Sequence, residues 1–341
     1  MFKTCCFLSF AALLLTACSS NKPAQEQFPA VGSILRLDPA LDALVPPDAK
    51  IEKLAGGFKF VEGPLAFSNG NVWFSDVVGN VVRQWSPDGA VTEILNPGGA
   101  DNPGYAPAGS YIGPNGMVHG KDGVVFLCQH GNRRIVQIDK NRQVSTFLDR
   151  WEGKRFNSPN DLVFKSNGAL YFTDPPYGLV KQDEDPAKEI PFNGVFRYAD
   201  GKLTPLIRDM TRPNGIAFSP DEKYLYISNS DDKHKVWMRY DVQPDGSLTN
   251  GKVFFDVTAE KDPGEPDGMK VDSKGNLYCA GPGGLWIFSP EGKHLGTIKP
   301  GETPANCNWG GPDRKTLYIT AETGLYRVRL AVEGEKALYN D

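Results

Sequence analysis

Four oxygen-bearing side chains stand out because each begins the same kind of segment. Glu62, Asn160, Asn214 and Asp267 are each followed by a short apolar run, a polar turn and a second apolar run. Two carboxylates and two amide oxygens, with no thiolate or imidazole among them, suit a hard cation, Ca²⁺ first and then Mg²⁺ or Mn²⁺. The alternative is a plug of hydrogen-bonded polar groups that closes a channel. The residue types alone do not choose between a metal site and a plug.

These segments belong to an internal repeat that predicts the fold. A polar residue followed by a hairpin pattern recurs six times, at intervals of 39 to 54 residues; the six polar residues are Glu62, Asn115, Asn160, Asn214, Asp267 and Asn306. A strand-rich repeat of roughly 40–50 residues is typical of a β-propeller. Asn-Gly and Asp-Gly are also common turn dipeptides, but each copy has a separate turn signal a few residues later. We therefore expect the six polar residues to face one axis.

The repeat also predicts the remaining strands of each blade. A third apolar strand follows every hairpin, and a fourth follows in the first five copies. The sixth copy lacks its fourth strand, and Ile51–Leu54 is the natural replacement. Pairing this segment with the last blade would remove two exposed sheet edges. The expected fold is all-β: a six-bladed propeller of four-stranded blades, with the ring closed by an N-terminal strand.

Hairpin geometry places further polar groups beside the axis. In an antiparallel hairpin the end of the second strand lies next to the start of the first. His130 should therefore lie near Asn115, and Asp174, followed by Tyr177, should lie near Asn160. We expect these four residues, Asn115, His130, Asp174 and Tyr177, to contact a substrate. For His130, the alternative is a loop residue that caps backbone groups. Residues 98–113 and 181–191 are candidate lids, or ordinary surface loops.

The N-terminus has the pattern of an export signal. Lys3 precedes an apolar run that is too short to span a bilayer, and the run ends in Leu15-Thr16-Ala17-Cys18. This resembles the bacterial lipobox, in which the cysteine is acylated; cleavage of an ordinary signal peptide near Ala17 is the alternative. We expect a signal peptide over 1–17, a tether over 18–47, the propeller over 48–335 and a tail over 336–341. Ser19 in place of Asp indicates an outer-membrane lipoprotein that faces the periplasm.

Composition excludes some functions. The chain has 341 residues and a formal net charge of −4, so nothing indicates a nucleic-acid surface. There is no Gly-x-Ser-x-Gly, no His-Glu-x-x-His and no phosphate-binding glycine loop. We expect a monomer whose anchor is the lipid on Cys18.

Several motifs together resemble one family. Glu62-Gly63-Pro64 with Trp73-Phe74-Ser75-Asp76, Ser158-Pro159-Asn160-Asp161, Arg212-Pro213-Asn214-Gly215 and Pro266-Asp267-Gly268-Met269 occur in order at blade spacing. They resemble the SMP-30/gluconolactonase/luciferin-regenerating-enzyme family over roughly residues 50–330. Gln129-His130-Gly131-Asn132-Arg133-Arg134 and the segment around Asp174-Pro175-Pro176-Tyr177 resemble its bacterial gluconolactonase branch.

The resemblance implies a chemistry. It implies a divalent metal in the channel, often Ca²⁺, with Mg²⁺, Mn²⁺ or Zn²⁺ as alternatives, and hydrolysis of a lactone such as a sugar lactone. By motif match, Glu62, Asn214 and Asp267 would be metal ligands, and Asn160 a fourth ligand or a substrate contact. Asp267 would act as general base or attack directly, and the sequence leaves both open. Two other classes also stay open: an organophosphate or phosphoester hydrolase on the same metal, and a non-catalytic propeller that binds a partner.

Overall fold

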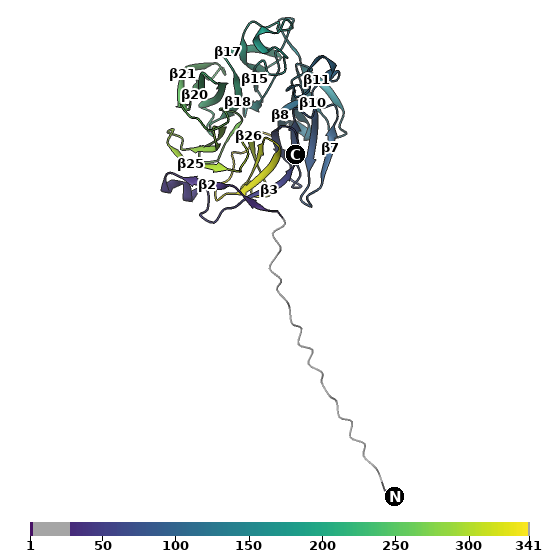
Figure 1. The fold of residues 1–341 in the computed structure, drawn as a ribbon, viewed down its shortest axis with the longest axis vertical. Coiled ribbons are helices and arrows are strands. Elements are labelled where there is room, and N and C mark those ends of the chain that lie inside the picture. Colours follow the sequence, from purple (N-terminus) through teal and green to yellow (C-terminus); the bar gives the residue numbers. More distant parts are fainter. Residues whose placement is uncertain (3–27, 340–341) are drawn as a thin grey trace.

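The computed structural model describes residues 1–2 and 28–339. In this part of the chain, six antiparallel sheets are arranged in a ring around a central channel (Figure 1). The six-bladed β-propeller predicted from the repeat is therefore confirmed. No helix among the described residues is long and apolar enough to cross a membrane.

The first three blades follow one another along the chain. Blade 1 consists of β4 (Val61–Ala66), β5 (Val72–Asp76), β6 (Val81–Trp85) and β7 (Val91–Leu95). Blade 2 consists of β8 (Pro114–His119), β9 (Val125–Gln129), β10 (Arg134–Ile138) and β11 (Val144–Leu148). Blade 3 consists of β14 (Leu162–Phe164), β15 (Leu170–Asp174), β16 (Asn193–Ala199) and β17 (Lys202–Met210), and is preceded by a small ribbon of β12 (Arg150–Trp151) and β13 (Lys154–Arg155).

The last two blades take in strands from the N-terminal region. Blade 4 consists of β18 (Pro213–Phe218), β19 (Tyr224–Asp231), β20 (His234–Val242) and β21 (Leu248–Asp256). Blade 5 consists of β22 (Met269–Val271), β23 (Leu277–Gly281), β24 (Gly284–Phe288), β25 (His294–Lys299) and β2 (Ser33–Arg36). Blade 6 consists of β26 (Pro304–Gly310), β27 (Thr316–Ala321), β28 (Gly324–Arg329), β3 (Ile51–Gly56) and β1 (Ala30–Val31). Short 3₁₀ turns lie at Pro39–Ala43, Pro103–Tyr105, Lys121–Gly123 and Gln182–Glu184.

The hydrophobic core is divided into six layers, one between each pair of neighbouring blades. Between blades 1 and 2, for example, Leu65 and Trp73 pack with Met117 and Leu127. Between blades 4 and 5, the fully buried Trp237 meets the aromatic side chains of blade 5. Because side chains alternate between the two faces of a strand, every blade contributes to two of these layers. The ring is therefore held together by sheet-on-sheet packing around its whole circumference.

The N-terminal strand closes the ring as expected. β3 pairs antiparallel with β28, with Ile51 opposite Val328 and Gly56 opposite Gly324. The tether predicted up to residue 47 is, however, wrong from residue 28 onward. β1 pairs with β3 and β2 pairs with β25, which adds a fifth strand to blades 6 and 5. Apolar packing holds this segment on the propeller, because Leu41 and Val45 are fully buried against blades 5 and 6. No strand periodicity marks these residues in the sequence.

The C-terminal residues run across one end of the channel. Glu335 N donates to the Val271 carbonyl of blade 5 at 3.0 Å, and the Tyr339 ring packs edge-on against Phe164 of blade 3 at 5.2 Å. We call Gly334–Tyr339 the C-terminal strap, the channel end that it crosses the base, and the opposite end the mouth.

Candidate active site

The axial residues lie at equivalent places on the six inner strands. Val61 pairs with Asp76, Pro114 with Gln129 and Pro213 with Asn229, and the next residue in each case is Glu62, Asn115 or Asn214. Asn160 and Asp267 occupy the same place in blades 3 and 5. In blade 6, Pro304 pairs with Ala321, so the equivalent residue is Ala305, and the expected Asn306 lies one position further on. Two equivalent hydrogen bonds support this assignment of Ala305. Gly116 N donates to the Asn160 carbonyl, and Gly268 N donates to the Ala305 carbonyl, both at 2.8 Å.

Glycines after the axial residues bring the inner strands together. A Cβ on Gly63 would lie 2.4 Å from the Asn115 carbonyl oxygen, and one on Gly215 would lie 2.3 Å from the Asp267 carbonyl oxygen. Such contacts are impossible for any other residue, so the glycines allow neighbouring backbones to touch. The Asn-Gly and Asp-Gly dipeptides therefore serve close packing around the axis rather than a tight turn.

Glu62 and Asp267 form a carboxyl pair at the mouth. Their carboxyl groups act on each other, and Ala305 occupies the position between them in the axial ring. Burial raises the pKa of Glu62 to about 7, opposed by the hydrogen bond from Gly63 N. Burial, together with the charge of Glu62, raises the pKa of Asp267 well above its usual value. Two buried carboxyls this close share a proton unless a cation joins them.

Asp161 adds a third carboxylate that the sequence analysis did not select. It is 1% exposed, its Oδ1 accepts from Leu162 N at 2.8 Å, and its Oδ2 lies 3.8 Å from Lys270 Nζ. Its charge raises the pKa of both Glu62 and Asp267. An alignment of the repeats could have revealed Asp161, because it occupies the position at which four other repeats have glycine. Three carboxylates thus face one ammonium, and the two remaining negative charges equal the charge of one divalent cation.

Buried oxygens without partners mark where a cation could bind. Within residues 28–339, Asn214 Oδ1 and Asp267 Oδ1 are buried and accept no hydrogen bond, although buried polar atoms are normally satisfied. Glu62 and Asp267 supply the charge, and Asn160, 3% exposed, lies on the same ring. No three His, Cys, Asp or Glu side chains in that range form a metal-binding cluster, so any cation here depends on amide oxygens as well. The donor set therefore fits a hard, oxygen-preferring divalent ion.

Two asparagine amides are oriented by a residue at the end of the second strand of the blade, which lies within β19 in blade 4 and directly after β9 in blade 2. Asn214 Nδ2 donates to Ser230 Oγ at 3.0 Å, and Ser230 in turn donates to the Pro266 carbonyl, which leaves Asn214 Oδ1 free to face the channel. In blade 2, Asn115 Nδ2 lies 3.2 Å from His130 Nε2, as the hairpin geometry predicted. Asn115 Oδ1 is likewise buried and without a partner among the described residues.

Asp174 has a different role from the one expected. Its Oδ2 accepts from Asn157 N and its Oδ1 from Ser158 N, both at 2.8 Å, and the side chain is fully buried. Burial raises the pKa of Asp174 to about 7, against the effect of these two bonds. Asn229 occupies the same position of blade 4, and its Oδ1 accepts a hydrogen bond from Arg212 N at 2.8 Å. Both residues fix the segment that leads into an axial asparagine, so the geometry supports a positioning role for Asp174 rather than a substrate contact.

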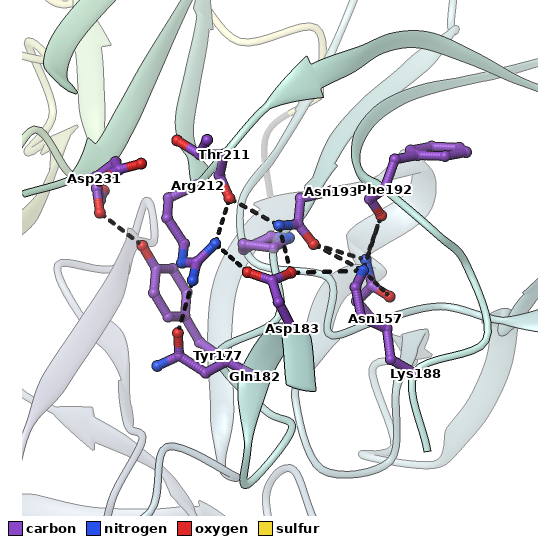
Figure 2. A network of polar contacts seen from close by, with 12 residues as sticks. Asn157, Tyr177, Gln182, Asp183, Lys188, Phe192, Asn193, Thr211, Arg212 and Asp231 are labelled. Atoms are coloured by element: carbon purple, nitrogen blue, oxygen red, sulfur yellow. Dashed lines mark hydrogen bonds and ion pairs between the residues drawn. The ribbon is translucent and has the colours of Figure 1, made fainter. Parts of the chain in front are cut away.

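The inserted loop of blade 3 is fastened to two blades (Figure 2). Lys188 Nζ donates to Asn157 Oδ1 at 3.1 Å and to Asn193 Oδ1 at 3.0 Å. Asp183 lies between Lys188 and Arg212 and forms an ion pair with Arg212 at 2.5 Å. Because Asn157 precedes Asn160 and Arg212 precedes Asn214, the loop braces both axial residues. Residues 181–191 therefore form a wall of the mouth that is bonded to the segments leading into both axial residues.

Tyr177 completes this wall. It is partly buried, and its hydroxyl donates at 3.5 Å to the carbonyl of Ser230, the residue that orients Asn214. Burial raises the pKa of the Tyr177 phenol, and the nearby charge of Asp267 adds to the effect. Tyr177 therefore lies close to the carboxyl pair, as its predicted substrate contact requires. The predicted lipidation residue, Cys18, lies outside the described residues.

The loop over residues 98–113 is also anchored. Asn80 Oδ1 accepts from Gly99 N at 2.8 Å and from Ala100 N at 2.9 Å, and Asn80 Nδ2 donates to the Ala100 carbonyl at 2.9 Å. Further along the loop, the Tyr111 carbonyl accepts from His130 Nδ1 at 3.0 Å. Both loops that were candidate lids are thus tied to the blades that carry the axial side chains.

The base of the channel has a different character. A cavity of about 660 Å³ lies there between the inner strands and the C-terminal strap. Each blade contributes the residue three positions beyond its axial one: Leu65, Val118, Val163, Ala217, Lys270 and Asn308. The Asn308 amide is satisfied, since its Nδ2 donates to the Pro64 carbonyl and its Oδ1 accepts from Trp309 N.

The fold and the site place this chain among six-bladed propellers that have buried oxygen acceptors at one end of the channel. Comparison with known proteins identifies the family within this class. The model of the SMP-30/Gluconolactonase/LRE-like region matches residues 60–323, so the chain belongs to that family. It is similar to a gluconolactonase from Zymomonas mobilis subsp. mobilis, with 42% identity over 319 residues that cover 89% of this chain and 88% of that one.

Solved structures agree with this assignment. A gluconolactonase from Xanthomonas campestris superimposes with a TM-score of 0.76 and 30% identity, covering 90% of this chain and 99% of that one. A calcium-binding regucalcin from Agrobacterium tumefaciens strain C58 has a TM-score of 0.63 and 21% identity over 84% of this chain and 95% of its own, and shows likeness of fold.

Proposed function

We propose that this protein is a metal-dependent lactonase that opens sugar-type lactones at the mouth of its channel. The observation that carries the proposal is the buried pair of Glu62 and Asp267, beside two acceptor oxygens without partners. Membership of the gluconolactonase family and the similarity to the Zymomonas mobilis gluconolactonase support the choice of substrate class.

Glu62, Asn160, Asn214 and Asp267 would hold the metal, with Ca²⁺ as the first candidate. The calcium-binding relative supports that choice, and so does the balance between two uncompensated negative charges and one divalent ion. When bound, the ion would polarise the lactone carbonyl and stabilise the negative charge that develops on its oxygen. The protein's own contribution is to orient the ligands through Ser230 and Asp174 and to exclude most water by the anchored loops.

Asp267 would act as the general base. It takes a proton from a water molecule whose oxygen bonds to the carbonyl carbon, and the ring carbon–oxygen bond then breaks. The departing ring oxygen receives this proton from Asp267 and becomes the hydroxyl of the open hydroxy acid. A single turnover in ¹⁸O-labelled water tests this role, because label found in the Asp267 carboxylate would show that Asp267 attacks directly.

A lactone panel assayed with and without Ca²⁺ tests the function as a whole. We expect hydrolysis of glucono-δ-lactone with Ca²⁺, loss of activity with a chelator and recovery when Ca²⁺ is added back. Mg²⁺, Mn²⁺ and Zn²⁺, tested in parallel, identify the preferred ion. Full activity in the presence of chelator, with no metal retained by the protein, would refute metal dependence.

We also propose that the protein is anchored to the outer membrane through a lipid on Cys18, facing the periplasm. The Leu15-Thr16-Ala17-Cys18 pattern and Ser19 support this localisation. Mass spectrometry of the mature N-terminus in the native host tests it, with Cys18→Ser expected to block acylation. A mature protein that begins downstream of Cys18 without lipid would contradict the proposal.

A further inference from the structure

The orientation of the Asn115 amide follows from the imidazole beside it. His130 Nδ1 lies 3.0 Å from the Tyr111 carbonyl oxygen, which can only accept, so Nδ1 carries the proton. In the neutral ring Nε2 is then an acceptor, and it lies 3.2 Å from Asn115 Nδ2. If the Asn115 amide were reversed, its oxygen would face the lone pair of His130 Nε2, which is repulsive. The arrangement therefore fixes Asn115 with its nitrogen on His130 and its oxygen away from it.

Burial keeps His130 in this state. The side chain is 1% exposed, and burial lowers its pKa to about 4, so the ring is neutral at physiological pH. Both ring nitrogens are used by the protein, one as donor to Tyr111 and one as acceptor from Asn115. A substrate therefore finds no free N–H or lone pair on His130.

Blade 4 uses the same device with a different residue. Ser230 directly follows the Asn229 that pairs with Pro213, and His130 directly follows the Gln129 that pairs with Pro114. Each of the two residues engages the nitrogen of its axial asparagine and leaves the oxygen without a partner. Ser230 thereby prepares Asn214 to present an oxygen to the channel, and His130 does the same for Asn115.

We propose that His130 is a positioning residue, and that the Asn115 oxygen it presents accepts a hydrogen bond from a hydroxyl group of a polyhydroxylated lactone. Asn115 lies between Glu62 and Asn160 in the axial ring, at the level of the proposed reaction. An acceptor buried without a partner is satisfied by a ligand O–H and is left unpaired by an aliphatic lactone. This inference rests on the proposed lactonase function and gives it a specificity-determining group.

The test compares two lactones of the same ring size. Glucono-δ-lactone carries hydroxyls and δ-valerolactone carries none, so the ratio of their kcat/KM values measures hydroxyl recognition. We expect Asn115→Leu to lower this ratio roughly tenfold to a hundredfold, with δ-valerolactone changed by less than about twofold. Asn115→Ala replaces the leucine variant if that one does not fold. Calorimetric Ca²⁺ affinity should not change, because the proposal gives Asn115 no role as a metal ligand.

A double-mutant cycle tests whether His130 acts through Asn115. His130→Phe removes both ring nitrogens and should lower the ratio as Asn115→Leu does, while the double variant should be no worse than Asn115→Leu alone. His130→Gln retains an acceptor and a donor and should restore most of the ratio. His119→Phe is the matched control: it removes a buried imidazole at the other end of β8 and should leave the ratio unchanged.

Each result has a definite meaning. Additive effects in the cycle, equal losses for both lactones in His130→Phe, or a fall in Ca²⁺ affinity in Asn115→Leu would overturn the inference. A wild-type protein that opens both lactones with a ratio insensitive to Asn115 would also overturn it, while leaving the lactonase function intact. A wild-type protein that opens neither lactone would refute the proposed function itself, and with it this inference.

Discussion

The two ends of the channel are built from the same six strands and differ in how their polar groups are satisfied. At the mouth, the oxygens of Asn115, Asn214 and Asp267 are buried without partners. Three residues further along each strand, at the base, four of the six side chains are apolar and the Asn308 amide is bonded through both its nitrogen and its oxygen. The base also has a buried polar atom without a partner, Trp309 Nε1, but this atom is a donor. The unpaired amide and carboxylate acceptors of Asn115, Asn214 and Asp267, which a cation or a hydroxyl group would satisfy, lie at the mouth.

Lys270 belongs to both ends. It lines the base cavity, and its ammonium reaches to within 3.8 Å of the Asp161 carboxylate, which acts on the carboxyl pair of the mouth. Close-packed glycines such as Gly63 and Gly116 separate the two compartments.

The largest effect is expected at Asp267. Asp267→Asn retains the size and one oxygen but removes the proposed base, so turnover of glucono-δ-lactone should fall by about 10²–10⁴-fold, even at saturating Ca²⁺. Asp221→Asn, at the rim of the base, is the control and should retain activity. Glu62→Gln should mainly weaken Ca²⁺ binding, with partial recovery at high Ca²⁺. Parental turnover in Asp267→Asn would remove the residue from the mechanism.

The second prediction concerns pH and stability without metal. The folded-state pKa of Glu62 is raised from 4.5 to about 7, so its contribution to stability is present below pH 4.5 and is lost as pH rises through 7. Asp267 is shifted in the same direction, and Asp161 and Lys270 face the pair. We expect Glu62 to contribute a loss on the order of 3 kcal/mol between pH 4.5 and 8 to the free energy of unfolding, in addition to the losses from the other raised carboxyls.

Denaturant unfolding in the presence of chelator measures this loss. Ca²⁺ should abolish most of it and should stabilise the protein more at pH 8 than at pH 5. Glu62→Gln is the matched control, because it removes this pair while Asp174, whose pKa is also raised to about 7, stays in place. Equal pH dependence in the parent and in Glu62→Gln would show that the carboxyl pair is not the cause.

The third prediction concerns the link between the two ends. Lys270→Met keeps the length of the side chain and removes its positive charge, which should make the carboxylate cluster more attractive to a cation. At about 10 Å and an effective dielectric constant of about 20, removing one positive charge facing a divalent ion changes the energy by on the order of 3 kcal/mol, or roughly a hundredfold tighter Ca²⁺ binding. Lys274→Met, in the exposed turn of the same hairpin, should leave the affinity unchanged by calorimetry. Weaker binding in Lys270→Met would contradict the charge count.

The smallest effect is expected at the base. Tyr339→Ala removes the edge-on contact with Phe164 and should cost about 1 kcal/mol in the free energy of unfolding. Lactone kinetics should be unchanged, because nothing at the mouth is touched. Urea unfolding and kcat/KM measured on one preparation check both halves of the prediction. A change in KM without a loss of stability would mean that the strap acts on the mouth.

The sequence predicts the blades well because their signals are local. Turn residues separate alternating apolar strands, and the third and fourth strands expected after the hairpins are present, for example Val81–Trp85 and Val144–Leu148. The closing strand followed from a missing one. Asn306 was misplaced because the shift in register between Pro304 and Asn306 depends on pairing across the hairpin. Packing is equally invisible in the sequence, which is why Leu41 and Val45 were assigned to a tether.

The site was predictable as a set of positions, but less so as a set of roles. The repeat placed Glu62, Asn214 and Asp267 on one axis, which needs only equivalence between copies. It could not separate an axial ligand from a residue that supports one, since Asp174 and Asp267 are both conspicuous acids near the mouth. The distinction depends on which backbone N–H groups reach the Asp174 oxygens. Asp161 was missed because its importance is a charge relationship with Lys270 across blades.

The closure of the ring by β3 has a consequence for the protein during its synthesis. Gly56 and its partner Gly324 are 268 positions apart, so β3 leaves the ribosome long before β28 exists. At about 5–20 residues per second, the interval is on the order of 10–50 seconds. Throughout that time β3 exposes an unpaired edge, which in a nascent chain invites chaperones or misassembly. A chain terminated early, after blade 5, could never seal, so translation must finish before the molecule has a single closed surface.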